Sequence, residues 1–180
     1  MKFKSILLLL MMSLAFVNCK NESTPTEAEK NEAEAPKNVF KVAVDVVVKK
    51  DDNFCLLYTE DGSLDFKEGV WQVVKGADAE QKVEFLLPVD VFPSQLRLDL
   101  GQKPEQEDIV IKKITFEYLG KTRVLVGQEI AAFFTPDTSK CTFDATTGIV
   151  KAVTKDGVKQ SPSLYPNQSI QAAEIPTLAK

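Results

Sequence analysis

Short runs of alternating apolar and polar side chains fill the chain from residue 38 onward, and this pattern constrains the fold most. Residues 38–49 read NVFKVAVDVVVK, and residues 95–101 read QLRLDLG, in which three leucines alternate with Arg97 and Asp99. A period of two residues places the apolar side chains on one face of a β-strand. Turn signals rich in Gly, Pro and Asp separate the runs, and no helical period extends beyond about two turns. The pattern predicts an all-β domain.

An antiparallel β-sandwich of the jelly-roll type is the expected architecture, and an immunoglobulin-like sandwich is the alternative. The chain is expected to form about eight to ten short strands, with a turn about every 8–12 residues, which is the pattern of such sandwiches. The longer expected strands are residues 38–49, 54–59, 70–74, 82–88, 95–101, 108–120 and 121–127.

Further local predictions concern irregularities in this pattern. In residues 108–120 the apolar residues change parity halfway, so a β-bulge at Lys112–Lys113 is predicted to return them to one face. Residues 76–81, GADAEQ, are expected to break the strand pattern, and residues 128–134 are the one predicted short helix. Residues 161–180 contain three prolines and are expected to be irregular.

The N-terminal residues have the pattern of a signal peptide that ends in a lipobox. Lys2 and Lys4 precede an almost entirely apolar run at residues 6–17, which is too short for a membrane span of about twenty residues. The following FVNCKNES places Cys19 where bacterial lipoproteins are cleaved and lipidated. With Asn18 in place of the usual small residue, the stretch resembles the relaxed lipoboxes of Bacteroidota lipoproteins. An ordinary signal peptide with an incidental cysteine is the alternative.

This N-terminal pattern divides the chain into three segments. Residues 1–18 are the expected signal peptide. Residues 19–37 are expected to be a lipidated cysteine with a disordered acidic tether, because they contain no large apolar side chain to bury. Residues 38–180 are the expected single domain. The lipid would hold the chain on a membrane of the bacterial cell envelope, with the outer membrane favoured and the domain in the periplasm or at the cell surface.

The charge balance argues against two classes of partner. The chain has 22 Lys and Arg against 26 Asp and Glu, a formal net charge of −4. Removal of the leader takes away two lysines and no acid, which leaves 20 basic against 26 acidic residues and a net charge of −6. An acidic chain without a basic block is unsuited to nucleic acid or to anionic lipid headgroups, so membrane contact is expected through acyl chains alone.

The residue inventory excludes most common catalytic sites. The chain has no histidine, which removes Ser-His-Asp and Cys-His catalysis and His-ligated metals. Paired carboxylates remain, but the acids are scattered and the domain is small for a glycan-gripping cleft, so a glycoside-active enzyme is only a distant alternative. No cofactor is expected. Structural calcium is considered at Asp51, Asp52 and Asn53, but their spacing matches no known calcium loop and a solvated turn is favoured.

Cys55 and Cys141 are the two cysteines of the expected domain. An exported compartment permits a disulfide, but sequence spacing cannot show whether their Cα atoms approach within bonding range. Both lie in apolar, strand-like contexts, FCLLY and KCTFD, so two buried free thiols are favoured over a bridge.

Aromatic side chains are the main route to a ligand, because the apolar C–H faces of sugars stack on exposed rings. The chain has one tryptophan, Trp71, and three tyrosines, at positions 58, 118 and 165. In VWQVV, Trp71 shares one side of the strand with Val73, which does not show which side faces water. Because tryptophan is usually highly buried, a core position is favoured and a ligand-binding position is the alternative.

The stretch FLLPVDVFPSQLRLDLGQKPEQEDIVIKKITFEYLG resembles a sandwich module of bacterial envelope and glycan-assembly proteins. The resemblance covers about residues 54–168 and is carried by Leu87-Pro88, by Leu96-Arg97-Leu98-Asp99 with Gly101, and by Ile109, Ile111 and Ile114. It implies a carbohydrate-binding-module-like sandwich in a small lipoprotein, with no established catalytic residues.

Arg97 and Asp99 share one face of their strand, about 7 Å apart and opposite the leucines. They suit two roles: holding the strand end to its neighbouring loops, which is favoured, or clasping sugar hydroxyls. The expected function is a non-catalytic, lipid-anchored envelope protein that binds a glycan or envelope polymer, with Trp71, Arg97 and Asp99 as candidate ligand-binding residues. An accessory subunit that recognises another envelope protein through a sheet face or edge is the alternative.

Overall fold

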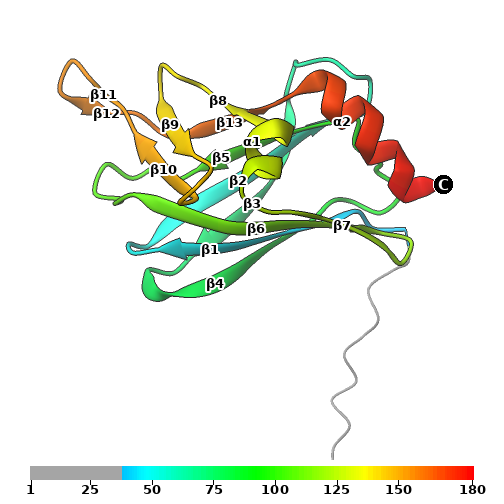
Figure 1. Cartoon of the computed structure of the whole chain (residues 1–180), viewed down its shortest axis with the longest axis horizontal. Coiled ribbons are helices and arrows are strands. Elements are labelled where there is room, and N and C mark those ends of the chain that lie inside the picture. Colours follow the sequence, from blue (N-terminus) through cyan, green and yellow to red (C-terminus); the bar gives the residue numbers. More distant parts are fainter. Residues whose placement is uncertain (1–37) are drawn as a thin grey trace, which may run out of the picture. The chain divides into compact units, whose positions relative to one another are not determined.

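A computed structural model describes residues 38–180, and Figure 1 shows the arrangement of their strands and helices. The predicted signal peptide, Cys19 and the predicted tether lie outside the described residues. Two antiparallel sheets pack face to face, which confirms the predicted all-β sandwich. No helix in the described part combines the length and the apolar character that a membrane crossing needs.

The larger sheet has six strands in the order β4-β1-β6-β10-β9, with β7 also paired to β6. These strands are β1 (Lys41–Val48), β4 (Ala77–Leu86), β6 (Ile109–Tyr118), β7 (Lys121–Leu125), β9 (Cys141–Asp144) and β10 (Ile149–Ala152). The smaller sheet has five strands in the order β3-β2-β5-β13-β8. These are β2 (Asp52–Thr59), β3 (Glu68–Val74), β5 (Gln95–Leu100), β8 (Phe134–Pro136) and β13 (Ser163–Pro166). The remaining elements are a hairpin of β11 (Thr154–Lys155) and β12 (Val158–Lys159), the helices α1 (Gln128–Phe133) and α2 (Gln168–Glu174), and the 3₁₀ helix η1 (Ile175–Ala179).

Strands β1 and β2, together with their partners β6 and β5, form an antiparallel ribbon that passes from one sheet into the other. β1 pairs with β6 in the larger sheet, and β2 pairs with β5 in the smaller one. The two intervening strands widen the sheets, since β3 pairs with β2 and β4 pairs with β1. This ribbon joins the two sheets of the predicted sandwich.

Apolar side chains from the inner faces of both sheets form one core. In β5, Leu96, Leu98 and Leu100 are buried in this core, as their alternation with Arg97 and Asp99 predicted. Aromatic rings contribute much of the remaining volume and also contact one another through offset and tilted pairs. The fully buried phenylalanines are Phe40, Phe54, Phe85, Phe116, Phe133 and Phe134.

The predicted β-bulge lies in β6. Asp45 of β1 is opposite Lys113, whereas the next residue, Val46, is opposite Ile111, so Lys112 is the extra residue. The bulge returns Ile111 and the following apolar residues to one buried face. The predicted short helix is also present, as α1.

Two local predictions are wrong. Residues 76–81 do not break the strand pattern, because β4 begins at Ala77 and its first four residues are all exposed, so they need no apolar alternation. Residues 161–180 are not irregular, because they form β13, α2 and η1. The prolines suit these elements: Pro166 ends β13, and Pro176 lies at the start of η1, where a missing N–H costs no hydrogen bond.

Helix α2 is tied to the sandwich by a buried glutamine. The side chain of Gln171 has no exposed area, and its Oε1 accepts a hydrogen bond of 2.7 Å from the Leu96 N–H. Its Nε2 donates to the carbonyl oxygens of Leu96 and Phe133, each at 3.2 Å. These bonds link α2 to α1 and to β5, the strand that carries Arg97 and Asp99.

Candidate ligand-binding face

The outer faces of the two sheets differ in their chemistry. On the larger sheet, ion pairs join neighbouring strands: Lys41 to Glu84 at 2.8 Å and Lys113 to Asp45 at 2.6 Å. The smaller sheet instead carries aromatic and apolar side chains around a single ion pair. We call this surface the aromatic face, and its residues are Leu57, Phe66, Trp71, Arg97, Asp99 and Tyr165.

Strand pairing places the predicted ligand-binding residues on one face. Trp71 of β3 is opposite Cys55 of β2, and Cys55 is opposite Asp99 of β5. Asp99 is in turn opposite Ser163 of β13. With neighbouring strands about 4.8 Å apart, the backbones at Trp71 and Asp99 lie about 10 Å apart. That separation is within the span of a short oligomeric ligand.

Trp71 is an exposed residue, and its favoured interpretation as a core side chain is wrong. It is 55% exposed, and Val73 beside it is 74% exposed. Val70 and Val74, on the other parity of β3, pack against the core, so the alternation turns Trp71 outward. An outward indole on a sheet presents a flat apolar ring to which a ligand can stack.

Arg97 and Asp99 form a bidentate ion pair. Arg97 Nε donates to Asp99 Oδ1 and Nη2 donates to Oδ2, both at 2.8 Å. The guanidinium also lies over the Tyr165 ring, 4.5 Å from its centroid, and Nη2 is 3.5 Å from Ser163 Oγ. The two hydrogen bonds to Asp99 and the contact with the Tyr165 ring hold the guanidinium plane in one position. The contacts with Tyr165 and Ser163 also link β5 to β13. Both side chains remain partly exposed to solvent.

Gly69 and Phe66 shape the rest of the aromatic face. A Cβ atom at Gly69 would lie 2.9 Å from both Cys55 Sγ and Leu57 Cδ2, so these two side chains occupy the space that a side chain at position 69 would need. Phe66, from the loop after β2, meets Tyr165 edge-on with ring centroids 6.4 Å apart. The face is therefore a shallow surface with rings at both ends.

Both cysteines of the domain are buried free thiols in the structure. Cys55 lies beneath the aromatic face, where burial, reinforced by the Asp99 carboxylate, raises the pKa of its thiol to about 11. Cys141 belongs to the core, with its Sγ 3.4 Å from the Ser163 carbonyl oxygen, and burial raises its pKa as well. At neutral pH both thiols are protonated and poorly nucleophilic.

A second polar cluster holds the end of β5. Asp52 is only 1% exposed, and its Oδ1 accepts backbone hydrogen bonds of 2.8 Å from Asn53 and from Gln102. Its Oδ2 accepts from Gln106 Nε2 at 3.1 Å, and a Cβ atom at Gly101 (φ +82°) would lie 2.7 Å from the same oxygen. The expectation of a solvated turn here is wrong for Asp52, because N–H donors replace water around its carboxylate.

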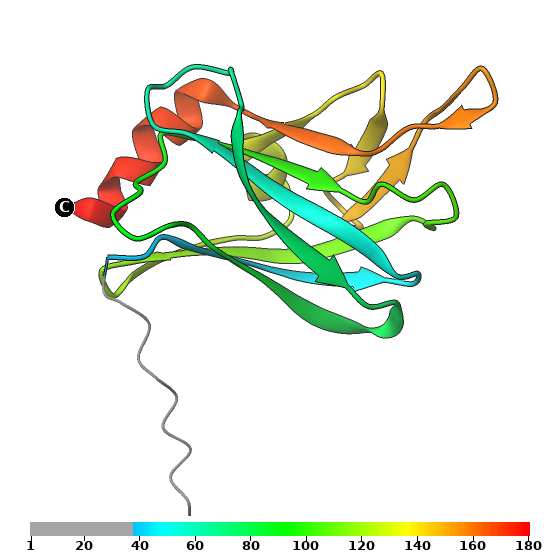
Figure 2. The same ribbon diagram turned by 180° about the vertical axis from the view of Figure 1, so that it is seen from behind.

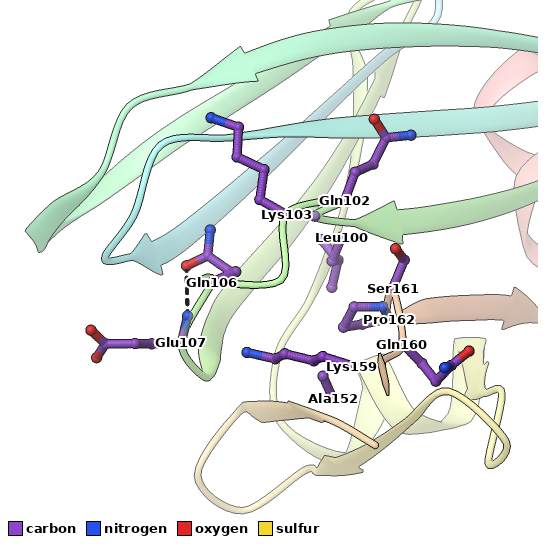
Figure 3. Close-up of a pocket in the computed structure, with 11 residues that line it drawn as sticks. Leu100, Gln102, Lys103, Gln106, Glu107, Ala152, Lys159, Gln160, Ser161 and Pro162 are labelled. Carbon is purple, nitrogen blue, oxygen red and sulfur yellow. Dashed lines mark hydrogen bonds between the residues drawn. The ribbon is translucent and has the colours of Figure 1, made fainter. Parts of the chain in front are cut away.

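A small pocket lies next to this cluster (Figure 3). It is lined mainly by the loop after β5 and by residues 159–162, and its volume of about 10 Å³ is no larger than one water molecule needs. In Figure 3 the Lys159 side chain points toward Gln106 and Glu107. The pocket is too small for an organic ligand, so its role is confined to the packing of these loops.

The described residues also form an acidic concavity. An open concavity of about 290 Å³ lies at the loop after β2, and its lining residues are Tyr58, Thr59, Glu60, Asp61, Ser63, Asp65, Lys67 and Glu68. Within residues 38–180, no three His, Cys, Asp or Glu side chains come together as a metal site requires.

No known family model matches the chain, and no curated protein resembles it in sequence at a significant level. The chemistry of the aromatic face is therefore the basis on which a function can be inferred.

Sequence reasoning identified Trp71, Arg97 and Asp99 as separate candidates, and the strand order β3-β2-β5 brings them onto one face. It missed Phe66, which lies in a loop without any periodic signal. It also missed that Asp52 is a buried hydrogen-bond acceptor, because a short run of polar residues does not show which of them is buried. The sequence alone could not show which side of VWQVV is exposed, because that depends on which side of β3 packs on the core.

Proposed function

We propose that the chain is a non-catalytic, lipid-anchored protein of the bacterial cell envelope that binds a glycan or envelope polymer on the aromatic face. The observation that carries this proposal is the exposed Trp71 indole on the same sheet face as the Arg97–Asp99 pair. A ring of this kind stacks on the apolar face of a sugar, while a neighbouring fork of donors and acceptors bonds its hydroxyl groups.

A hydroxyl-rich ligand without strong charge fits the electrostatics best. The Asp99 carboxylate, 2.8 Å away, compensates the charge of Arg97, so the aromatic face offers polarity without net charge. The net charge of the chain, −4, disfavours a strongly acidic polymer. Rings interleaved with a polar pair also differ from the continuous apolar patch that a protein partner favours.

The shape of the face supports a binding role over a catalytic one. Five of its six residues lie on neighbouring strands of one sheet and include a single carboxylate, whereas catalysis on a glycan needs two carboxylates held on either side of the scissile bond. Asp99, the acid on this face, is engaged with Arg97 through both oxygens.

Glycan binding can be tested with an array of neutral and acidic glycans together with insoluble cell-wall polymer. The wild-type chain is compared with Trp71→Ala and with Leu86→Ala, which removes a 48% exposed leucine from the other sheet. We expect Trp71→Ala to weaken binding at least about tenfold, or about 1.4 kcal/mol, without a change in melting temperature. Leu86→Ala should bind as the wild type does. Absence of wild-type binding to every glycan, or equal binding by wild type and Trp71→Ala, would contradict the proposal.

A further inference from the structure

The smaller sheet ends, within residues 38–180, in a strand that pairs on one side only. β3 pairs with β2, and no other described strand joins its free side. Figure 2 shows β3 and β4 following one another along this side of the sandwich. An unpaired strand edge is a template for pairing with another chain, and proteins usually guard such edges with charges, prolines, short strands or covering elements.

The other outermost strands of the two sheets carry such protection. β8 has three residues and ends in Pro136, and β9 has four residues. β4 is long, but it places a charged residue at every second position: Asp78, Glu80, Lys82 and Glu84.

β3 is protected less, since its one charged residue is the exposed Glu68 at its first position. From Gly69 to Val74 it reads GVWQVV, without a charge or a proline. Its aromatic and β-branched side chains favour strand pairing. Trp71 and Val73 are also the two apolar side chains that β3 exposes most, at 55% and 74%. The outer backbone groups of β3 therefore have no strand partner within the described residues, and the side chains along this edge are mostly apolar.

We infer that β3 pairs with β3 of a second copy of this chain, antiparallel and about a two-fold axis at Gln72. In this register Trp71 is opposite Val73 of the second copy, and Val70 is opposite its Val74. Aromatic and β-branched residues opposed in this way stabilise an antiparallel pair. Gln72 is opposite the second copy's Gln72, and each amide can donate to and accept from the other.

The side chains of β3 favour a second copy over an unrelated extended segment. The register places Trp71 beside Val73 of the other copy in both chains at once and leaves the outward face of each ring open, and no charge lies in the paired segment Val70–Val74 to oppose a like charge. A two-fold axis is also the commonest symmetry of protein oligomers. The charged residues of β4 do not interfere, because they alternate with Val83 and Phe85 of the core and so lie on the outer face of the larger sheet.

This pairing joins two five-stranded sheets into one continuous sheet and places both aromatic faces on the same side of it. Self-association goes beyond glycan binding and would occur without any ligand. For a repeating polymer, two linked faces would raise the overall affinity above that of one face, because the second binding event becomes intramolecular.

Cysteine cross-linking of the full chain in membranes tests both the pairing and its register. Directly opposed Cα atoms in an antiparallel pair lie about 4.5 or 5.5 Å apart, which is within the range for a disulfide. On mild oxidation we expect Gln72→Cys to form a disulfide-linked dimer and Val73→Cys alone to form none. Coexpressed Trp71→Cys and Val73→Cys chains should form a mixed dimer. The wild-type chain, whose Cys55 and Cys141 are buried, is the blank.

A second substitution controls for random collision. Adding Val73→Lys to Gln72→Cys places a charge opposite Trp71 of the second copy and should reduce the dimer at least about tenfold, as edge lysines oppose strand pairing. Absence of a Gln72→Cys dimer, equal cross-linking of all single variants, or a cross-link to a different protein instead would overturn the inference. The covalent dimer is measured without a glycan, so its outcome does not depend on the proposed function.

Discussion

Arg97 and Trp71 contribute to the aromatic face in different ways. Arg97 is held between the Asp99 carboxylate and the Tyr165 ring, so its guanidinium has a fixed orientation. Trp71 projects from an edge strand and is more than half exposed. Loss of Arg97 should therefore affect both stability and binding, whereas loss of Trp71 should leave the stability of the folded domain unchanged.

Replacing Arg97 tests the structural part of this distinction. Arg97→Ala removes the two hydrogen bonds to Asp99, the longer one to Ser163 and a ring contact, and it leaves Asp99 partly buried without its partner. We therefore expect the free energy of unfolding to fall by about 1–2 kcal/mol. Arg97→Lys keeps the charge but not the planar guanidinium, so its free energy of unfolding should lie between those of the wild type and Arg97→Ala. Urea denaturation measures both variants. Full retention of stability by Arg97→Ala would show that the pair has no structural role.

The Cys55 thiol makes stability depend on pH in the alkaline range. Its pKa is raised from 9.0 to about 11 by burial and by Asp99, so above pH 9 the unfolded chain loses this proton more readily than the folded one. The contribution is fully present below pH 9 and is lost as the pH rises toward about 11. We expect urea denaturation to show a smaller loss between pH 8 and pH 10.5 for Cys55→Ala than for the wild type. An identical loss in both would contradict the assigned cause.

At the scale of elements, the end of β5 depends on a residue from another strand. Asp52, the first residue of β2, accepts hydrogen bonds from the loop that follows β5, and Gly101 allows that loop to pass close to the carboxylate. Gly101, the glycine that closes QLRLDLG, therefore leaves room for the Asp52 carboxylate. Asp99 of the same stretch accepts hydrogen bonds from Arg97.

Removal of the Asp52 carboxylate should be among the most costly changes to a polar residue in the domain. Asp52→Ala leaves the backbone N–H groups of Asn53 and Gln102 and the Gln106 amide without their acceptor, so we expect a loss of about 3 kcal/mol in the free energy of unfolding. Asp51→Ala, at the exposed neighbouring acid, is the matched control and should change stability little. Similar melting temperatures for the two variants would contradict this role.

Alternation predicted the elements well where one face of a strand is buried. The core leucines of β5 and the Lys112 bulge both followed from parity, because burial imposes a period of two. The start of β4 was missed because Ala77–Glu80 are exposed throughout. The prediction that Trp71 lies in the core was wrong, because alternation assigns residues to two faces of a strand but does not show which face is buried. That depends on strand order, which arises from contacts distant in sequence.

At the scale of the whole molecule, the proposal combines a lipid anchor with the aromatic face. The anchor is inferred from the sequence at Cys19, and the binding role is inferred from the sandwich. The two parts can be separated experimentally, because the anchor sets where the protein resides and the aromatic face sets what it binds.

Cys19→Ser tests the anchor. Without the thiol no lipid can be attached, so we expect the chain to move from the membrane pellet to the released fraction after cell fractionation, because acyl chains supply about 0.8 kcal/mol per buried methylene. Cys55→Ser is the control and should stay in the pellet. Retention of Cys19→Ser in the membrane would show that another feature holds the protein there.

The binding role of the aromatic face is tested most directly by the fluorescence of Trp71, the single tryptophan of the chain. In the free protein its emission should be that of a solvent-exposed indole and should be readily quenched by acrylamide. Saturation with a glycan that binds on the array should shift the emission to the blue and protect it from quenching. A bound glycan that leaves both the emission and the quenching of Trp71 unchanged would contradict the proposal that this face holds the ligand.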